Sequence, residues 1–173
     1  MPVLHLLRHA KSGWNDEIED HERPLSRAGR DAARLIARHL PTATGRLDLV
    51  LCSSALRTRE TLDLVLAAFA MRPRVLIEDE LYLAATAVLL NRLRTLAEPE
   101  ERVMLIGHNP GLHELALMLA RTDSRPYRAL AGGKFPTAAR ASFRIAPGWS
   151  AIDRSQHELV DYATPKSLAG TEE

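Results

Sequence analysis

Arg8 and His9 stand side by side at the end of the first apolar run of the chain. A guanidinium group can hold the oxygens of a phosphate or carboxylate, and an imidazole can act as a nucleophile. An isolated Arg-His pair is also compatible with a solvated turn. Two further polar sites of the same kind, later in the chain, favour the chemical interpretation.

Both later sites also follow apolar runs. Ser53 and Arg57 come after the run at 47–52, and His108 comes after the run at 103–106. Phosphate is the anion best suited to arginine side chains combined with helix N-termini. Phosphoryl transfer requires mainly positive charge around the transferred group, together with a nucleophile. The residue types therefore predict phosphoryl transfer.

His9 is the predicted nucleophile. Its imidazole would attack phosphorus while Arg8 holds the phosphoryl oxygens, and the covalent intermediate would split one difficult step into two easier ones. For this role His9 must be neutral at the attacking nitrogen, whereas His108 binds a phosphoryl group best as a cation. We therefore expect environments that separate the pKa values of the two histidines.

These residues can meet if the apolar runs are neighbouring parallel strands, because the carboxyl ends of such strands lie at one edge of the sheet. Apolar runs alternate with segments of helical periodicity, which predicts an α/β fold with a mainly parallel central sheet and helices on both faces. The expected strands are 3–7, 47–52, 75–77, 103–106, 141–145 and 158–162, and the expected helices are 26–40, 55–69, 86–97 and 109–120.

Local signals add further expectations. Trp14 lies in a long polar loop and is expected to pack into the core, since tryptophan is highly buried on average. Pro41 and Gly45 are expected to end the first helix. Asn109 is expected to cap a later helix that has Pro110 at its first position. The segment 121–136 is expected to be irregular.

Composition limits the class of protein. The chain has 173 residues, of which 46% are hydrophobic and 26% charged, and this is an ordinary globular balance for one domain. A net charge of +1 gives no reason to expect nucleic-acid or membrane binding. Cys52 is the only cysteine, so no intramolecular disulfide can form. We expect a soluble, cytoplasmic protein.

The motifs together resemble a known family, the histidine phosphatase (phosphoglycerate mutase-like) superfamily. The resemblance rests on Leu7-Arg8-His9-Ala10, Ser53-x-x-x-Arg57-Thr58-x-x-Thr61 and Gly107-His108-Asn109-Pro110. The chain is also similar to the compact SixA-type phosphohistidine phosphatases. That similarity rests on Arg8-His9-Ala10-Lys11-Ser12, Asp20-x-x-Arg23-Pro24-Leu25 with Gly29, Leu81-Tyr82 and Lys134-Phe135-Pro136-Thr137.

The resemblance covers nearly the whole chain and implies a single histidine phosphatase domain over residues 1–173. It implies that His9 is the phosphorylated nucleophile and that Arg8, Arg57 and His108 bind the phosphoryl group. It also implies that the reaction uses no metal and no cofactor. The expected partner is a protein that carries phosphohistidine, or else a small phosphorylated substrate.

Larger members of the superfamily often have a carboxylate general acid after the third strand, and Glu80 is the nearest match. Glu80 is also compatible with a solvated turn carboxylate, because the sequence around it differs from the pattern of those members and because the imidazole of phosphohistidine is already a good leaving group. The short connection after the third strand leaves no room for a large cap domain, so an open site is expected. Asp20 and Arg23 are expected to fix their loop to the helix that follows.

Several competing functions fit parts of the sequence. A cysteine phosphatase would place five residues between its cysteine and arginine, but only four separate Cys52 from Arg57, so Cys52 is expected to be a buried strand residue. A zinc hydrolase is disfavoured because His108 and His113 are five residues apart and face different sides of a helix. A broad phosphomonoesterase, a mutase and a non-catalytic phosphate-binding module stay open at this point.

Overall fold

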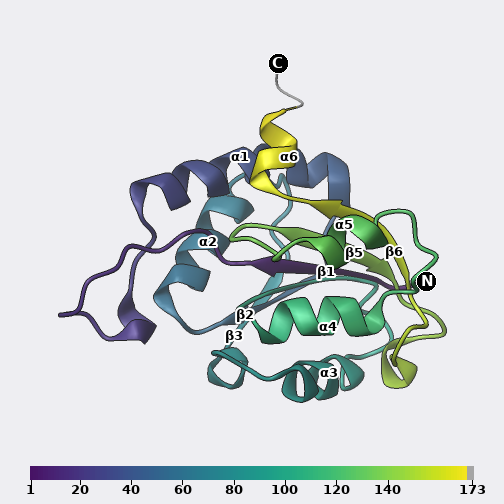
Figure 1. Cartoon of the computed structure of the whole chain (residues 1–173). Coiled ribbons are helices and arrows are strands. Elements are labelled where there is room, and N and C mark those ends of the chain that lie inside the picture. Colours follow the sequence, from purple (N-terminus) through teal and green to yellow (C-terminus); the bar gives the residue numbers. More distant parts are fainter. Residues whose placement is uncertain (171–173) are drawn as a thin grey trace.

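Strand β1 (Val3–Arg8) lies inside a six-stranded sheet of order β3-β2-β4-β1-β5-β6, in the computed structural model that describes residues 1–170 (Figure 1). The pairs β1–β4, β2–β4 and β2–β3 are parallel, and β5 is antiparallel to both of its neighbours. The predicted mainly parallel sheet is confirmed. The other strands are β2 (Leu49–Ser53), β3 (Arg74–Glu78), β4 (Arg102–Gly107), β5 (Arg140–Arg144) and β6 (Glu158–Ala163).

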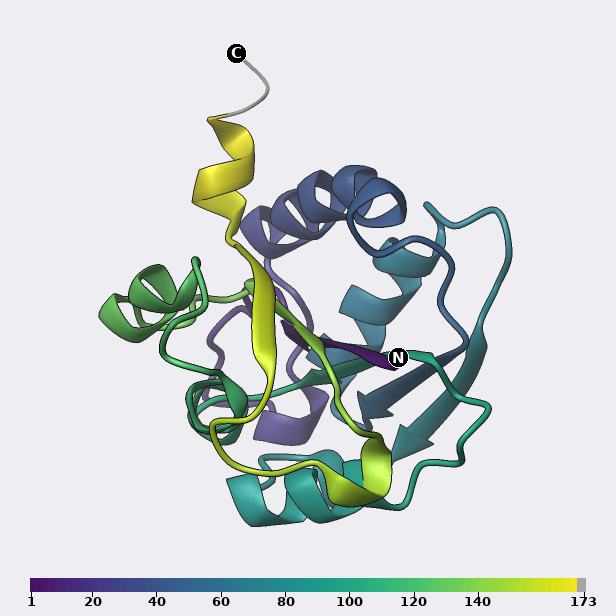
Figure 2. The ribbon, with the colours of Figure 1, turned by 90° about the vertical axis from the view of Figure 1, so that its right-hand side faces the viewer.

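Helices cover both faces of the sheet, as predicted (Figures 1 and 2). Alternate residues of β1 point to opposite faces, so that Leu4 and Leu6 enter one core and Leu7 enters the other. The first core contains residues of α3 and α4, and the second contains residues of α1 and α2. The helices are α1 (Arg27–Thr44), α2 (Leu56–Leu66), α3 (Thr86–Arg94), α4 (Gly111–Leu119), α5 (Tyr127–Gly132) and α6 (Pro165–Ala169).

The long α1 ends at the second of the two residues predicted to end it. Ser26 caps its start by accepting a hydrogen bond from the Gly29 amide at 3.0 Å, but the helix runs through Pro41 and ends at Gly45. Proline removes one amide donor and keeps its carbonyl, and the Pro41 carbonyl accepts from the Gly45 amide at 3.0 Å. Pro41 is therefore tolerated near the end of the helix, and a left-handed Gly45 (φ 65°) ends it.

Three other local expectations are wrong. Trp14 is 78% exposed on the loop that joins β1 to α1. The segment expected to be irregular contains the short helix α5. Asn109 does not cap α4, which starts after Pro110, and its side-chain NH2 donates to the carbonyls of Lys134 and Phe135 at 3.2 and 2.9 Å.

Among the described residues, no helix has both the length and the apolarity that crossing a membrane requires.

Candidate active site

The carboxyl ends of β1, β2 and β4 meet at one edge of the sheet, because these neighbouring strands run parallel. Next to these ends lies an open cavity of about 320 Å³. Its lining includes the four predicted residues Arg8, His9, Arg57 and His108. The same cavity is also lined by Lys11, Ser12, Arg23, Leu83, Asn109 and Thr137. The sheet therefore brings together the residues that the three sequence motifs predicted.

His9 is held in one orientation by its own backbone. Its Nδ1 lies 2.7 Å from the carbonyl oxygen of Ala10, and because a carbonyl can only accept, Nδ1 carries the proton and donates. In the neutral ring, Nε2 then keeps the lone pair, as a nucleophile requires. The Ala10 amide donates to Thr61 Oγ1 at 3.0 Å, which ties this turn to α2.

The two histidines of the cavity lie close together, with ring centroids 5.2 Å apart. Burial, followed by the positive charges of Arg57 and Arg8, lowers the pKa of His9 to about 4. Burial is also the main cause that lowers the pKa of His108 to about 3, with His9 and Arg57 adding to it. The expected separation of the two pKa values is therefore not found in the structure. Both rings share one buried, positively charged environment that disfavours any further positive charge.

His108 is fixed by two neighbours. Its Nε2 forms a 2.7 Å hydrogen bond with Ser53 Oγ at the end of β2, and its ring meets the Tyr82 ring edge-on at 5.5 Å between centroids. The sequence marks Ser53 only as a polar residue at a strand end. The structure shows it to be a direct partner of the second cavity histidine.

Arg57 is almost completely buried and pairs with Asp20, a residue of the β1–α1 loop. Its Nη1 donates to the Asp20 carbonyl at 2.7 Å and its Nη2 donates to the Asp20 carboxylate at 3.0 Å. The Tyr82 hydroxyl donates to the same carboxylate, and Arg23 Nη1 donates to it at 2.9 Å. The hydrogen bond from Tyr82 is the largest of the effects that lower the pKa of Asp20 to about 2, and those of Arg57 and Arg23 add to it. Desolvation raises the pKa, but by less than the Tyr82 bond lowers it.

Asp20 and Tyr82 are site residues whose role the sequence does not reveal. Asp20 is expected to fix its loop to α1, but its ion pair with Arg57 fixes the loop to α2. Arg23 holds the loop together, since its Nε donates to the Gly13 carbonyl at 3.1 Å and its guanidinium also binds Ser12. The Asp-x-x-Arg and Leu-Tyr motifs are the available signal, although neither shows which residue they contact.

Arg8 is oriented by the segment that precedes β5. Its Nη1 donates to the Phe135 carbonyl at 3.1 Å, and Asn109 donates to the same oxygen. The Phe135 ring is stacked between His113 and Tyr162, with centroids 5.7 and 5.8 Å away. Within the described residues the buried Arg8 Nε has no hydrogen-bond partner, and an oxyanion in the cavity is the kind of acceptor it requires.

Two other predicted residues lie elsewhere. Glu80 is exposed on the short 3-10 helix η2 (Asp79–Leu81) and is not among the residues that line the cavity. Cys52 is completely buried in β2, as expected, and burial raises the pKa of its thiol to about 12. A thiol with so high a pKa is protonated and is a poor nucleophile at neutral pH.

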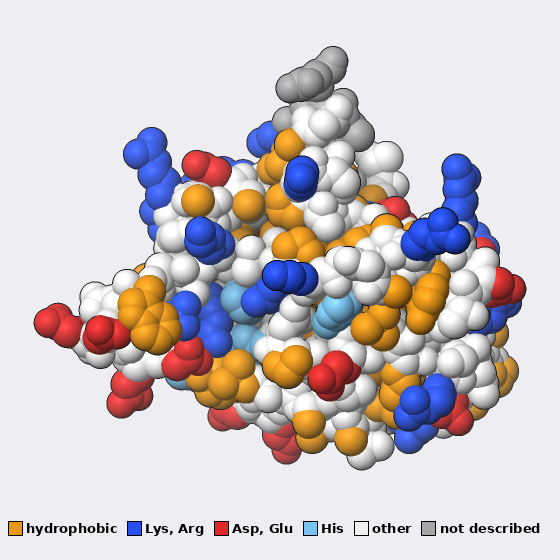
Figure 3. Space-filling model, viewed as in Figure 1, with side chains coloured by type: hydrophobic (Ala, Val, Ile, Leu, Met, Phe, Trp, Pro, Cys, Tyr) orange, Lys and Arg blue, Asp and Glu red, His pale blue; other side chains and the backbone are white. Residues whose placement is uncertain are grey.

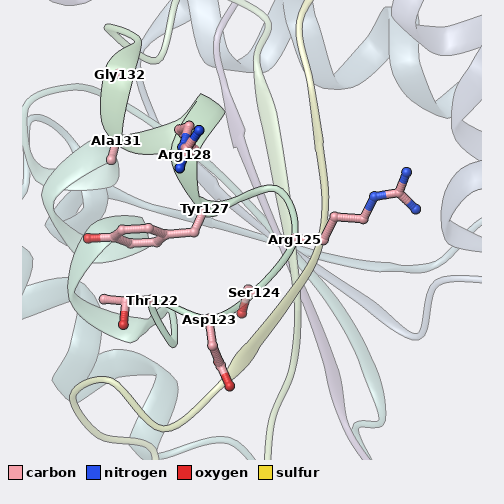
Figure 4. Close-up of a pocket in the computed structure, with 8 residues that line it drawn as sticks. All are labelled: Thr122, Asp123, Ser124, Arg125, Tyr127, Arg128, Ala131 and Gly132. Carbon is pink, nitrogen blue, oxygen red and sulfur yellow. The ribbon is translucent and has the colours of Figure 1, made fainter.

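A broader hollow of about 860 Å³ lies along α5 and the turn before it (Figure 4). None of the predicted site residues lines it, although Arg125, Arg128 and Tyr127 do. Figure 4 shows Arg125 extending away from the other labelled side chains, so that the two arginines do not converge on one point. We therefore place the chemistry in the cavity at the strand ends.

Comparison with known proteins agrees with this geometry. The sequence model of the histidine phosphatase superfamily (branch 1) matches residues 4–82. The uncharacterized protein Rv1276c of Mycobacterium tuberculosis (strain ATCC 25618 / H37Rv) is 31% identical over 163 residues, which are 92% of this chain and 100% of that protein.

Two solved structures are similar over almost their whole length. A protein of Agrobacterium tumefaciens, assigned as phosphohistidine phosphatase SixA, is 30% identical with a TM-score of 0.78 over 95% of this chain and 99% of that one. One from Nakamurella multipartitia with the same assignment is 27% identical with a TM-score of 0.82, over 95% of this chain and 96% of that one. The chain belongs to the histidine phosphatase superfamily and is of the SixA type.

Proposed function

We propose that the protein is a phosphatase that works through a covalent phosphohistidine on His9 and acts on phosphohistidine displayed by another protein. The observation that carries the proposal is the bond from His9 Nδ1 to the Ala10 carbonyl, at the wall of a cavity lined by Arg8, Arg57 and His108. This bond leaves Nε2 of the neutral ring unprotonated, in a cavity whose lining includes the cations Arg8 and Arg57.

In the first step, the lone pair of His9 Nε2 attacks phosphorus, and the bond from phosphorus to the substrate nitrogen breaks. The leaving imidazole keeps that electron pair. The Ala10 carbonyl stabilises the positive charge that develops on the His9 ring, since it accepts the Nδ1 proton in a hydrogen bond. Arg8 and Arg57 neutralise the negative charge on the equatorial oxygens of the phosphoryl group during its transfer.

In the second step, water attacks phospho-His9, the bond from phosphorus to Nε2 breaks and inorganic phosphate leaves. His9 returns to its neutral form, which its low pKa favours at neutral pH. A phosphoryl dianion beside His108 raises the pKa of that ring, because an opposite charge favours the protonated form. His108 thereby gains its positive charge when the substrate binds.

The choice of phosphohistidine as substrate is supported by the similarity to the SixA-assigned structures and by the exposed position of Glu80. The imidazole of phosphohistidine leaves without strong acid assistance. The alkoxide of an alkyl phosphoester is a poorer leaving group and requires a general acid. The role of Glu80 as such an acid stays a prediction, and Glu80→Gln tests it. Loss of turnover on an alkyl phosphate, with unchanged turnover on the phosphohistidine protein, would assign the role.

The deciding experiment compares the wild type with His9→Ala and Cys52→Ala on a phosphohistidine protein and on an aryl phosphate, with EDTA present. We expect Cys52→Ala to keep its activity and His9→Ala to be inactive. When the substrate carries a labelled phosphoryl group and the reaction is quenched with acid, we expect no label on Cys52 of the wild type. Normal turnover by His9→Ala, or loss of activity in EDTA, would refute the proposed mechanism. A preference for the aryl phosphate would favour a broad phosphomonoesterase.

A further inference from the structure

Two large apolar side chains, Trp14 and Leu83, are exposed beside the cavity, and Ile18 is exposed on the same loop as Trp14. Trp14 is 78% exposed, Ile18 is 36% exposed and Leu83 is 54% exposed. Leu83 lines the cavity itself, and Trp14 stacks on the guanidinium of Arg23, another lining residue, at 5.2 Å from carbon to ring centroid. Apolar side chains gathered in this way are typical of interaction surfaces.

The backbone beside Trp14 is restrained by hydrogen bonds, and that of Leu83 has an unusual conformation. Gly13, which precedes Trp14, is bonded through its carbonyl to Arg23 and through its amide to the Pro24 carbonyl at 3.2 Å. Leu83 has a left-handed backbone (φ 49°), which is uncommon for leucine and is often found at functional positions. A side chain held in place before binding loses little freedom when it binds.

The side-chain charges change from positive in the cavity to negative at the tip of the β1–α1 loop. The lining carries the cations Arg8, Lys11, Arg23 and Arg57, and the exposed tip of the β1–α1 loop beyond Trp14 carries Asp16, Glu17 and Glu19. Figure 3 shows histidine and basic side chains side by side, apolar side chains next to them, and acidic side chains at the end of the projecting loop. A complementary partner carries a phosphoryl anion that enters the cavity, an apolar surface around that anion, and cations farther out that face the acidic loop tip.

We propose that Trp14, Ile18 and Leu83 form a docking surface for a folded phosphoprotein whose phosphorylated side chain is surrounded by apolar and, farther out, basic residues. The proposal rests on the proposed function for the nature of the reacting group. A small phosphorylated molecule is contained by the cavity and leaves Trp14 in water. Only a macromolecular substrate covers Trp14 and Ile18 and meets the acidic tip.

The test uses two substrates that share the reacting bond. One is phosphoimidazole, and the other is a folded carrier domain phosphorylated on its histidine with phosphoramidate. We expect Trp14→Ala and Ile18→Ala to change kcat/KM for phosphoimidazole by less than about twofold, and Trp14→Ala to lower kcat/KM for the carrier domain by about tenfold or more. Met71→Ala is the matched control, since Met71 is 61% exposed and lies outside the cavity lining.

The charge arrangement is tested separately, with two carrier domains that have basic or acidic residues around the phosphohistidine. We expect the wild type to prefer the basic domain at low salt and the double variant Glu17→Lys, Glu19→Lys to lose that preference. An equal effect of Trp14→Ala on both substrates, or an effect on the carrier domain no larger than that of Met71→Ala, would overturn the docking surface.

Failure of the proposed function has a different result. If the wild type hydrolyses neither substrate, the phosphatase is refuted while docking is still measured, by calorimetric titration of the wild type and Trp14→Ala with the phosphorylated carrier domain. A weaker Kd for Trp14→Ala alone supports the docking surface. Equal dissociation constants, or no binding to the wild type, overturn it.

Discussion

Asp20 binds Arg57 through both its backbone carbonyl and its carboxylate, at 2.7 and 3.0 Å. A loop residue thus determines where a buried cavity arginine points, and Tyr82 in turn fixes the loop residue. Arg57 is the group expected to stabilise charge on the phosphoryl oxygens. Asp20 is therefore the point at which the β1–α1 loop positions a residue of the candidate site.

The first prediction concerns this pair. Arg57→Ala should lower kcat by about 10²- to 10³-fold, because it removes a preorganised cation from the transition state. Asp20→Asn keeps the side-chain size but weakens the orienting ion pair, and it should lower kcat by about tenfold. Asp31→Asn is the control, since Asp31 pairs with Arg34 on the surface of α1 at 3.4 Å. Steady-state kinetics on phosphoimidazole measure all three, and a normal kcat for Asp20→Asn would contradict the orienting role.

A second prediction concerns the ionisation of His9. Its pKa of about 4 means that the neutral nucleophile persists far below the ordinary histidine pKa of 6.5 and becomes protonated only as the pH falls through about 4. An NMR titration of the histidine ring protons measures this value, with His9→Ala to assign the signal. Removing the nearby cation in Arg57→Ala should raise the midpoint. A wild-type midpoint near 6.5 would show that the ring is neither buried nor surrounded by positive charge.

Acid stability gives a third prediction. Burial, and then the charges of Arg140 and Arg102, lowers the pKa of His5 from 6.5 to about 3, so between these values the unfolded chain binds a proton that the folded chain does not. Stability therefore falls as the pH drops below about 6.5, by about 2 kcal/mol between pH 7 and pH 5 for this residue. His5→Asn can keep the hydrogen bond to Ser142, now 2.7 Å, without titrating. Urea unfolding at the two pH values should show a smaller decrease for His5→Asn than for the wild type.

Two glycines give a fourth prediction. A Cβ at Gly29 would lie 1.9 Å from the Lys11 carbonyl oxygen, and a Cβ at Gly111 would lie 2.1 Å from the Ala84 carbonyl oxygen. Both contacts are with backbone, so Gly29→Ala and Gly111→Ala should each cost about 1–3 kcal/mol or more. At Gly132 nothing lies within 4 Å, and Gly132→Ala should be neutral or stabilising by up to about 1 kcal/mol. Thermal unfolding of the three variants checks the contrast.

The strand ends of the site are predictable because each motif follows a short apolar run, and parallel strands bring such ends together. Contacts that depend on loop geometry are not predictable in this way. The Tyr82–Asp20 bond joins residues 62 positions apart, and no periodicity relates them. The average burial of tryptophan predicts a core position for Trp14, but its loop projects from the body and exposes it (Figure 1).

The pKa values of His9 and His108 could not be predicted from the sequence for a different reason. The separation expected for His9 and His108 follows from what catalysis would need, whereas the values follow from burial and from the arginines around both rings. Likewise, Asn109 has the residue type of a helix cap, but its side chain does not cap α4 and instead contacts the segment before β5 through its NH2 group. Both outcomes depend on segments distant in sequence.

Strand β1, which precedes His9, pairs with two strands that come much later in the chain. Val3 pairs with Arg102 on one side and with Arg144 on the other. During synthesis, the nucleophile's strand must therefore wait for most of the chain before either edge is hydrogen-bonded. We expect the return of the proposed activity during refolding to report that β1 has paired with both β4 and β5.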